Sequence, residues 1–159
     1  MLIDTPLLVV GRGPAALLVA RFVSGSSMSS LLAGHEVLGG EVPVVLDPEA
    51  VAVLTPHGVL DVLRPYLAAA EPPAIAPATF EEVLKHHCVA DMNITVYDGL
   101  ELVERVRRGE GVTGVLTDGR ARWEVTADAF VDAAELPSWL AAAIPAAAER
   151  ADAVLHALH

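Results

Sequence analysis

A glycine-rich turn near the start of the sequence constrains the fold more than any other feature. Residues 6–10 form an unbroken apolar run, which is typical of a strand buried on both faces of a parallel sheet. The run ends at Gly11, and Pro14 suits the first turn of a helix, which we expect over 15–23. Residues 30–34 then predict a second short strand. The first 35 residues therefore predict a β–α–β unit with the glycines between strand and helix.

The turn has the spacing G-x-G-x-x-A, a variant of the fingerprint of dinucleotide-binding folds. Gly11 permits a tight turn, Gly13 lets a pyrophosphate approach the backbone, and the small Ala16 lets helix and strand pack closely. The free N–H groups at the start of the helix would face the phosphates, and Arg12 would add a positive charge. A turn that merely needs glycines is the alternative interpretation. The candidate residues are Gly11, Arg12, Gly13, Pro14, Ala15 and Ala16.

The same fingerprint requires an acid at the end of the second strand, to hold the hydroxyl groups of the adenosine ribose. Glu36 lies 20 residues after Ala16, near the expected distance, although a direct count places Gly34 there. His35 precedes Glu36 in a loop, where contact with a ligand is favoured over acid–base chemistry. A solvated loop acid is the alternative interpretation of Glu36.

The middle of the chain is less regular. Residues 47–54 predict a short helical piece, 57–70 have a helical spacing that Pro65 interrupts, and 71–77 read as a connector. A capping box formed by Thr79 and Glu82 predicts the start of the next helix.

The second half of the chain reads mainly as strands. Asp118 and Gly119 are a strong hairpin signal, and residues 107–111 read as another turn. Residues 137–159 are rich in alanine and predict helix on both sides of Pro145. The strands that we expect cover 93–98, 100–106, 112–117, 120–127 and 129–134.

Composition narrows the possible partners. The net charge of −11 disfavours nucleic acids and anionic membrane surfaces, and the densest basic cluster is flanked by Glu104 and Glu110. No stretch approaches the roughly 20 apolar residues of a membrane span, and no signal peptide is recognisable. The single cysteine, Cys88, fits a reducing compartment, so we expect a cytoplasmic protein. It follows two histidines that point in different directions from a helix, so we expect no metal site.

The length of 159 residues suits one domain, with residues 1–135 as its core and 136–159 as a C-terminal helical segment. Within 5–135 the chain resembles the FAD-binding domain of the superfamily that includes glutathione reductase and succinate dehydrogenase. VVGRGPAAL is similar to that family's V-G-x-G-P-A-G-L, and LGG at 38–40 is similar to its L-G-G. The pattern over 76–135 is similar to its helix, strand and returning hairpin.

This resemblance implies an α/β, Rossmann-like parallel sheet with helices on its faces and a three-stranded antiparallel β-meander as one crossover. It implies FAD as the cofactor, with NAD less favoured and NADP least. The ADP half would lie on the glycine turn, and Leu102 would offer its backbone to adenine. The other residues that it brings to the cofactor are His35, Glu36, Gly39, Gly40 and Ala134.

Three departures from the family pattern affect the functional prediction. The returning strand ends in Ala133, Ala134 and Glu135 where the family has Ala-Thr-Gly, so a carboxylate could repel the pyrophosphate. The family's later G-D motif is missing, and we expect no substrate domain. A second copy or a partner subunit would then have to cover the flavin.

The sequence predicts a minimal FAD-binding protein or the FAD-binding subunit of an oxidoreductase. One alternative is a Rossmann-like protein that has lost the cofactor and acts as a structural or regulatory interaction module. Another is a fragment of an NAD-binding oxidoreductase. The sequence assigns no catalytic residue.

Overall fold

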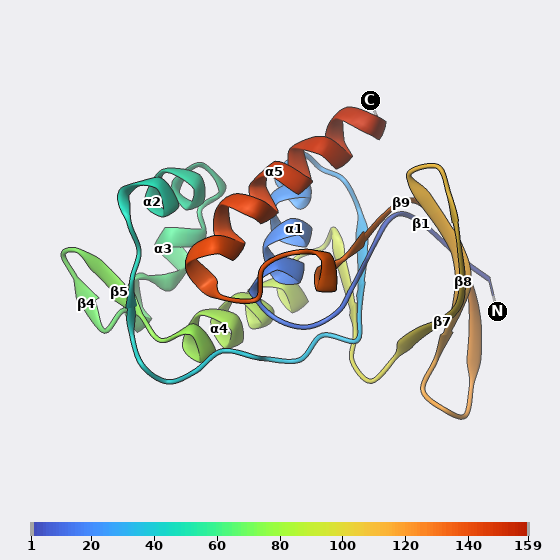
Figure 1. Cartoon of the computed structure of the whole chain (residues 1–159), viewed down its shortest axis with the longest axis horizontal. Coiled ribbons are helices and arrows are strands. Elements are labelled where there is room, and N and C mark those ends of the chain that lie inside the picture. The colour runs from blue at the N-terminus through green and yellow to red at the C-terminus, as the bar shows by residue number, and fades with distance from the viewer. Residues whose placement is uncertain (1, 159) are drawn as a thin grey trace.

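The computed structural model describes residues 2–158 and shows an α/β fold built on a six-stranded sheet (Figure 1). The strand order across this sheet is β6-β2-β1-β9-β8-β7. Its strands are β1 (Leu2–Val10), β2 (Ser30–Ala33), β6 (Ile94–Tyr97), β7 (Glu101–Arg108), β8 (Gly111–Thr117) and β9 (Arg122–Asp132).

Neighbouring strands are parallel in one half of the sheet and antiparallel in the other. β6, β2, β1 and β9 are parallel to one another, whereas β7, β8 and β9 form an antiparallel meander. The meander connects β6 at one edge to β9 beside β1, which is the crossover expected from the sequence. The prediction of an α/β sheet with a β-meander crossover is therefore confirmed.

Two strands are longer than the sequence pattern indicates. β1 begins at Leu2 rather than at residue 6, because residues 2–5 pair with residues 124–127 of β9. The strands expected over 120–127 and 129–134 are one continuous strand, so the expected break at Asp128 is wrong. β9 ends at Asp132, whose carboxylate accepts a hydrogen bond from the N–H of Ala134 in a following 3₁₀ turn.

Five α-helices accompany the sheet within residues 2–158, and three of them have 11 residues or more. α5 crosses in front of α1 in Figure 1, and Ala143, Ala147 and Ala151 of α5 are fully or almost fully buried. Small side chains there let the two helices approach closely. The helices are α1 (Pro14–Ser24), α2 (Pro48–Leu54), α3 (Val59–Leu63), α4 (Pro77–Ala90) and α5 (Leu140–Leu158).

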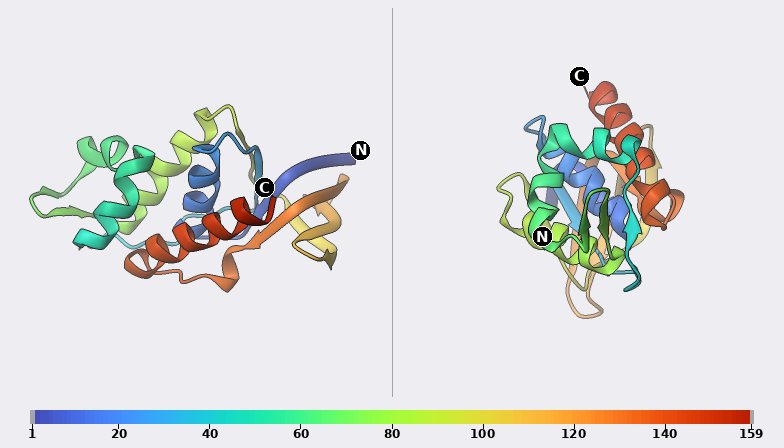
Figure 2. Two further views of the ribbon diagram at one scale, coloured as in Figure 1. Left: turned by 90° about the horizontal axis from the view of Figure 1, so that it is seen from above. Right: turned by 90° about the vertical axis from the view of Figure 1, so that its left-hand side faces the viewer.

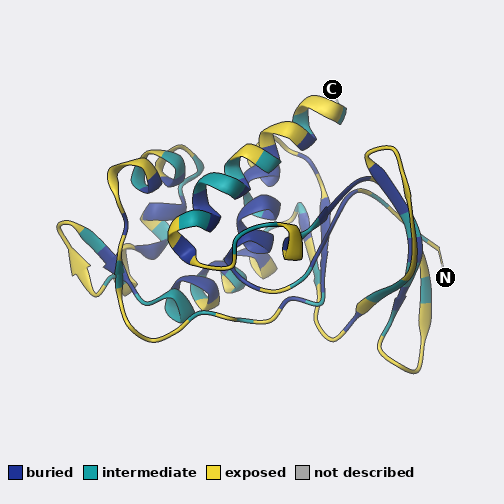
Figure 3. Cartoon of the chain, viewed as in Figure 1, coloured by how far each residue is buried: buried dark blue, intermediate teal, exposed yellow. Residues whose placement is uncertain are grey.

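The helices and the meander cover opposite faces of β1. Leu7 and Val9 belong to a large core shared with the helices, whereas Leu8 and Val10 belong to a second core of strand residues and Leu100. The burial colours of Figure 3 show α1 dark blue at the centre and more exposed strands in the meander. The structure thus refines the expectation of helices on the sheet's faces: the curled meander takes the place of helices on the second face.

Residues 44–75 form a small subdomain between β2 and α4 in the sequence, at the end of the molecule opposite the meander (Figure 2). The expected connector over 71–77 contains a strand, because Pro73–Ile75 pair with two neighbours in a three-stranded antiparallel sheet. Pro65 interrupts helical structure as expected, within a 3₁₀ turn after α3. The small sheet has the order β3 (Val44–Val45), β5 (Pro73–Ile75) and β4 (Ala69–Ala70).

The expected capping box at the start of α4 is wrong. The helix begins at Pro77, and Thr79 lies inside its first turn. The N–H of Ala78 donates to the carbonyl oxygen of Gly40 at 2.9 Å, so a loop carbonyl takes over part of what a side-chain cap would do. Within residues 2–158, the structure has no helix that is both long and apolar enough to cross a membrane.

Candidate functional site

The glycine-rich turn lies between β1 and α1 at the carboxyl edge of the parallel strands. Gly11 and Gly13 have φ angles of 112° and 90°, a region that glycine adopts most readily. A Cβ on Gly11 would lie 3.0 Å from the Cβ of Ala133, so the turn packs directly on the end of β9. The conformation and the close approach both explain why the sequence has glycine at these two positions.

Pro14 is the first residue of α1, so the turn leads straight into a helix N-terminus. The N–H groups of the first helical turn have no partner within the helix and carry its partial positive charge. Ala15 and Ala16 are buried beneath the neighbouring segments, which confirms the close packing expected for Ala16.

The segment that follows β2 crosses the glycine turn and bonds to it twice. The N–H of Gly13 donates to the carbonyl oxygen of Glu36 at 3.0 Å, and Nε2 of His35 donates to the carbonyl oxygen of Gly13 at 3.0 Å. Leu38 then reaches the open face of Gly13, where its Cδ1 lies 3.3 Å from the position that a Cβ would occupy. The face that the fingerprint keeps free of side chains is therefore in contact with Leu38.

A cleft of about 490 Å³ opens beside the turn, at the ends of β1 and β2. Nε of Arg12 and Oε2 of Glu36 form an ion pair across 3.4 Å, and both residues line this cleft. Gly34 has a φ of 68°, and a Cβ there would lie 2.9 Å from the carbonyl oxygen of Leu100. The other lining residues are His35, Gly99, Leu100, Glu101, Thr117, Asp118 and Gly119.

A smaller pocket of about 250 Å³ continues the cleft toward the meander. It shares Arg12 and Gly34 with the cleft and adds Gly11, Leu102 and Arg105. A bulge between Val103 and Val106 of β7 interrupts the pairing next to Arg105. The cleft and this pocket together form one concave surface at the carboxyl edge of the sheet, where ligands of open α/β sheets bind.

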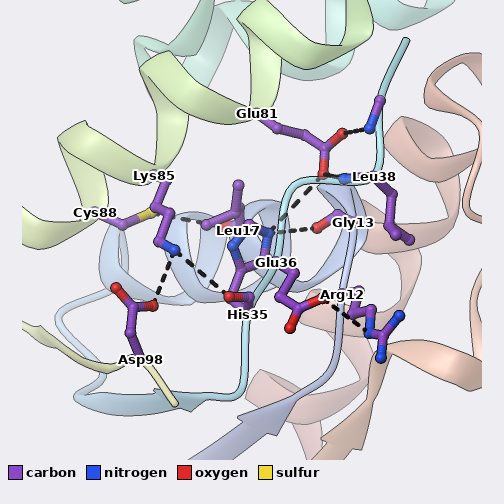
Figure 4. Close-up of polar contacts among 11 residues, drawn as sticks. Arg12, Gly13, Leu17, His35, Glu36, Leu38, Glu81, Lys85, Cys88 and Asp98 are labelled. Atoms are coloured by element: carbon purple, nitrogen blue, oxygen red, sulfur yellow. Dashed lines mark hydrogen bonds and ion pairs between the residues drawn. The ribbon is translucent and has the colours of Figure 1, made fainter.

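Glu81 of α4 is a buried carboxylate that points toward the segment carrying Leu38 (Figure 4). Its Oε1 accepts a hydrogen bond from the N–H of Leu38 at 3.1 Å, and its Oε2 accepts one from the N–H of Gly39 at 2.5 Å. Oε1 lies 4.0 Å from Nε2 of His35. The two hydrogen bonds hold the segment after β2 at Leu38 and Gly39.

Burial controls the protonation of this group of side chains. It lowers the pKa of His35, with a smaller lowering from Lys85, against a raising contribution from the bond to Gly13. A neutral ring whose Nε2 donates to Gly13 leaves Nδ1 as an acceptor, and Nδ1 is buried without a hydrogen-bond partner among the described residues. Burial also raises the pKa of Glu81, against a lowering by the N–H groups of Leu38 and Gly39.

Several residues predicted from the sequence to meet a cofactor come together here. Arg12, His35 and Glu36 line the cleft, and Gly11 and Leu102 line the adjoining pocket. The other residues of the turn are buried and line neither of them: Gly13, Pro14, Ala15 and Ala16. Gly39 and Gly40 instead line a separate hollow of about 360 Å³ with Trp139 and Leu140. Ala134 lies in the turn after β9, where its N–H is bonded to Asp132, so neither the cleft nor the pocket includes it.

Glu135 does not point a free carboxylate at the glycine turn. Its Oε1 lies 2.6 Å from Nη2 of Arg107, and its Oε2 lies 3.8 Å from Nη2 of Arg150. The expectation that this carboxylate would repel a pyrophosphate is therefore weakened, because two guanidinium groups neutralise it.

Sequence reasoning missed Glu81 and the position of Leu38. Glu81 shares a helix face with Leu84 and Cys88, at spacings of three and seven residues, and all three are buried. That periodicity was a usable signal for a buried carboxylate. The contact between Leu38 and Gly13 had no signal, because it depends on the path of an irregular segment.

Comparisons with known proteins support the fold. No protein-family model matches the sequence, and no curated protein matches it either. Among solved structures, the chain is similar to the flavin-dependent monooxygenase PieE in complex with FAD and substrate, with a TM-score of 0.67 at 18% identity. The match covers 80% of this chain and 30% of PieE.

Two further solved structures are similar over a comparable share of the chain. One is a flavoprotein/dehydrogenase from Cytophaga hutchinsonii, with a TM-score of 0.64, 16% identity, and coverage of 82% of this chain and 39% of that one. The other is p-nitrophenol 4-monooxygenase PnpA from Pseudomonas putida DLL-E4, with a TM-score of 0.63 at 17% identity. That match covers 82% of this chain and 40% of PnpA. The chain therefore spans between 30% and 40% of the length of these three proteins, and the likeness shows a shared fold.

Proposed function

We propose that this chain binds FAD through the ADP half of the cofactor and serves as the FAD-binding part of an oxidoreductase. The observation that carries the proposal is the turn with Gly11 and Gly13 at positive φ, placed between a parallel strand and a helix N-terminus beside an open cleft. The flavin-binding neighbours named above share this fold.

The cleft fits the adenosine part of such a ligand. Glu36 lines it with an exposed carboxylate that can accept hydrogen bonds from ribose hydroxyls, and Leu102 offers backbone groups at the meander side. The first-turn N–H groups of α1 and the Arg12 guanidinium suit the pyrophosphate. Two features oppose the fit: Leu38 lies over Gly13, and the carbonyl oxygen of Glu36 already accepts the N–H of Gly13.

The flavin, when bound, supplies the hydride chemistry, and this chain would bind and orient the cofactor. We propose that a second copy or a partner subunit covers the flavin side. We also propose that the chain belongs to the superfamily of glutathione reductase and succinate dehydrogenase. Under the same proposal, residues 1–159 form a single domain and the protein is cytoplasmic.

Substitution of Gly13 tests the proposal. Gly13→Glu places a bulky carboxylate at the phosphate position, so we expect FAD and ADP affinity to fall at least about tenfold while the protein stays folded. Gly58→Glu is the matched control, because Gly58 has a φ of 72° and nothing lies within 4 Å of its added Cβ. The readouts are titration calorimetry with ADP and FAD, and circular dichroism. Equal ADP affinity in Gly13→Glu and the wild type would sink the idea.

A cofactor-free interaction module is the second candidate function. It is favoured by the contacts that Gly13 already makes, since Glu36 takes its N–H and Leu38 covers its face. This alternative predicts that neither FAD nor NAD raises the melting temperature. A ligand at about a hundred times its dissociation constant should instead stabilise the fold by about 2.7 kcal/mol. Stabilisation by NAD alone would favour an NAD-binding fragment.

A further inference from the structure

Residues 35–40 form a strap that runs from the end of β2 across the glycine turn to the start of α4. Two hydrogen bonds fasten the strap to the turn: the side-chain Nε2 of His35 donates to the carbonyl oxygen of Gly13, and the backbone N–H of Gly13 donates to the carbonyl oxygen of Glu36. The next contact is apolar: Cδ1 of Leu38 lies against the face of Gly13, 3.3 Å from the position of an added Cβ.

The strap is held most firmly from α4. Both carboxylate oxygens of Glu81 accept backbone N–H groups of the strap, from Leu38 and from Gly39. Gly39 approaches α4 so closely that an added Cβ would lie 2.4 Å from the carbonyl carbon of Pro77 and 2.6 Å from Oε2 of Glu81. Hydrogen bonds to an ionised acceptor are stronger than bonds between neutral groups. The backbone of Leu38 is thus fixed, although the residue as a whole is 47% exposed.

Leu38 and a pyrophosphate compete for one place. A pyrophosphate binds a fingerprint of this kind by approaching the second glycine, whose missing Cβ leaves the space. In this structure Leu38 fills that space. Its side chain also borders the hollow that Trp139 and Leu140 line, so a rotation away from Gly13 has somewhere to go.

We propose that Leu38 is a plug over the phosphate position and that Glu81 is the residue that positions it. Nucleotide phosphates then bind only after the Leu38 side chain leaves the face of Gly13. This inference rests on the proposed function, because it concerns the same site. It also says what limits the affinity for nucleotides at this site. Only the fraction of molecules in which the plug is open can bind, so the apparent affinity is the intrinsic affinity multiplied by that fraction.

Removal of the Leu38 side chain tests the first half of the proposal, that Leu38 blocks the phosphate position. If the open state makes up about a tenth of the molecules, Leu38→Ala should bind ADP about tenfold more tightly than the wild type. Adenosine, which has no phosphate, should bind both proteins equally. Val42→Ala is the control, because Val42 is an equally apolar and more exposed residue just beyond the strap. Titration calorimetry gives the three dissociation constants.

Loosening of the strap tests the second half of the proposal, that Glu81 positions Leu38, and this test needs no ligand. In the wild type, the amide protons of Leu38 and Gly39 should exchange slowly with solvent, because the Glu81 carboxylate holds them. Glu81→Gln presents an amide group in place of one acceptor, so exchange at these two sites should accelerate at least about tenfold. It should also tighten ADP binding. Glu82→Gln, at the exposed neighbouring position, should change neither quantity.

The outcomes separate the plug from the proposed function. If the wild type and Leu38→Ala bind ADP with the same affinity, the plug is overturned and nucleotide binding stands. If neither protein binds ADP, the proposed function fails, and the plug fails with it. If Leu38 and Gly39 exchange as fast in the wild type as in Glu81→Gln, Glu81 does not position the strap.

Discussion

Nε of Arg12 lies 3.4 Å from Oε2 of Glu36, so the cation expected at the phosphates and the acid expected at the ribose pair with each other. Their side chains are 62% and 67% exposed and stand at the mouth of the same cleft. The charges therefore neutralise one another where a dinucleotide would enter, and either side chain can turn toward a ligand at small cost.

The first prediction concerns this pair. Arg12→Ala and Glu36→Gln should each change the free energy of unfolding by less than about 1 kcal/mol, because exposed ion pairs contribute little. Glu36→Gln should nevertheless weaken adenosine and ADP binding, since the carboxylate is the ribose acceptor under the proposed function. Urea unfolding and titration calorimetry measure the two effects. A large loss of stability without a loss of affinity would assign Glu36 to folding alone.

The second prediction compares two adjacent glycines. Gly39→Ala should destabilise the protein by about 2 kcal/mol or more, because its Cβ would lie 2.4 to 2.6 Å from three atoms of α4. Gly40→Ala should be close to neutral, since nothing lies within 4 Å of its added Cβ. Thermal or urea unfolding of the two variants gives the difference. Equal stability would contradict the close approach of the strap to α4.

The third prediction is a pH dependence that His35 causes. Burial lowers the pKa of this ring below its unfolded value of 6.5, so the unfolded chain binds the proton first as the pH falls. The stability that His35 contributes is present above pH 6.5 and is lost below it. Lys85 also lowers its pKa, whereas Asp98 and Glu36 raise it.

The comparison with His35→Gln isolates this effect. The glutamine keeps a donor for the carbonyl of Gly13 and does not titrate. The wild type should therefore lose stability relative to His35→Gln as the pH falls below 6.5. His57, whose pKa burial also lowers, is present in both proteins and cancels. A stability difference that does not depend on pH would show that His35 is not buried neutral.

The elements that the sequence predicts well are those whose signal is local. The apolar run before Gly11 and the proline after it specify β1 and α1, and the Asp118–Gly119 pair specifies the β8–β9 hairpin. The errors have non-local causes. Asp128 does not interrupt β9, because β1 pairs with the strand on both sides of it. Thr79 does not cap α4, because the carbonyl oxygen of Gly40 bonds to Ala78.

The candidate site likewise has one part that the sequence predicts and another part that it does not. The glycine turn and Glu36 follow a spacing that the chemistry of a dinucleotide requires, so a linear pattern reveals them. The plug and its positioning residue depend on where an irregular strap passes over α1 and α4. Glu81 also contradicts the usual exclusion of charged side chains from cores, and only its backbone partners explain its burial.

The fourth prediction concerns the thiol of Cys88. Burial, reinforced by Asp91, raises its pKa to about 12, and its Sγ lies 3.8 Å from the carbonyl oxygen of Leu17 in α1. Because the thiolate is the reactive form, a disulfide reagent should modify the folded protein about a hundredfold more slowly than the unfolded chain. Absorbance of the released thiol reports the rate. Rapid modification of the folded protein would place Cys88 at a mobile surface.

The fifth prediction tests whether Glu135 affects the nucleotide site. Its carboxylate already pairs with Arg107 and Arg150, so Glu135→Ala should change ADP affinity by less than about twofold and stability by less than about 1 kcal/mol. Asp132→Ala is the informative comparison, because that less exposed carboxylate both pairs with Arg105 and accepts the N–H of Ala134. It should lose about 1 to 2 kcal/mol of stability.

The same two variants show whether the departure from the family pattern at the end of β9 affects nucleotide binding. If Glu135 repels a pyrophosphate despite its two guanidinium partners, its removal tightens ADP binding about tenfold, and added salt reduces that gain. If the partners neutralise it, affinity stays constant at every salt concentration tested. The limit on affinity then lies at Gly13, where Leu38 and not a charge stands in the way.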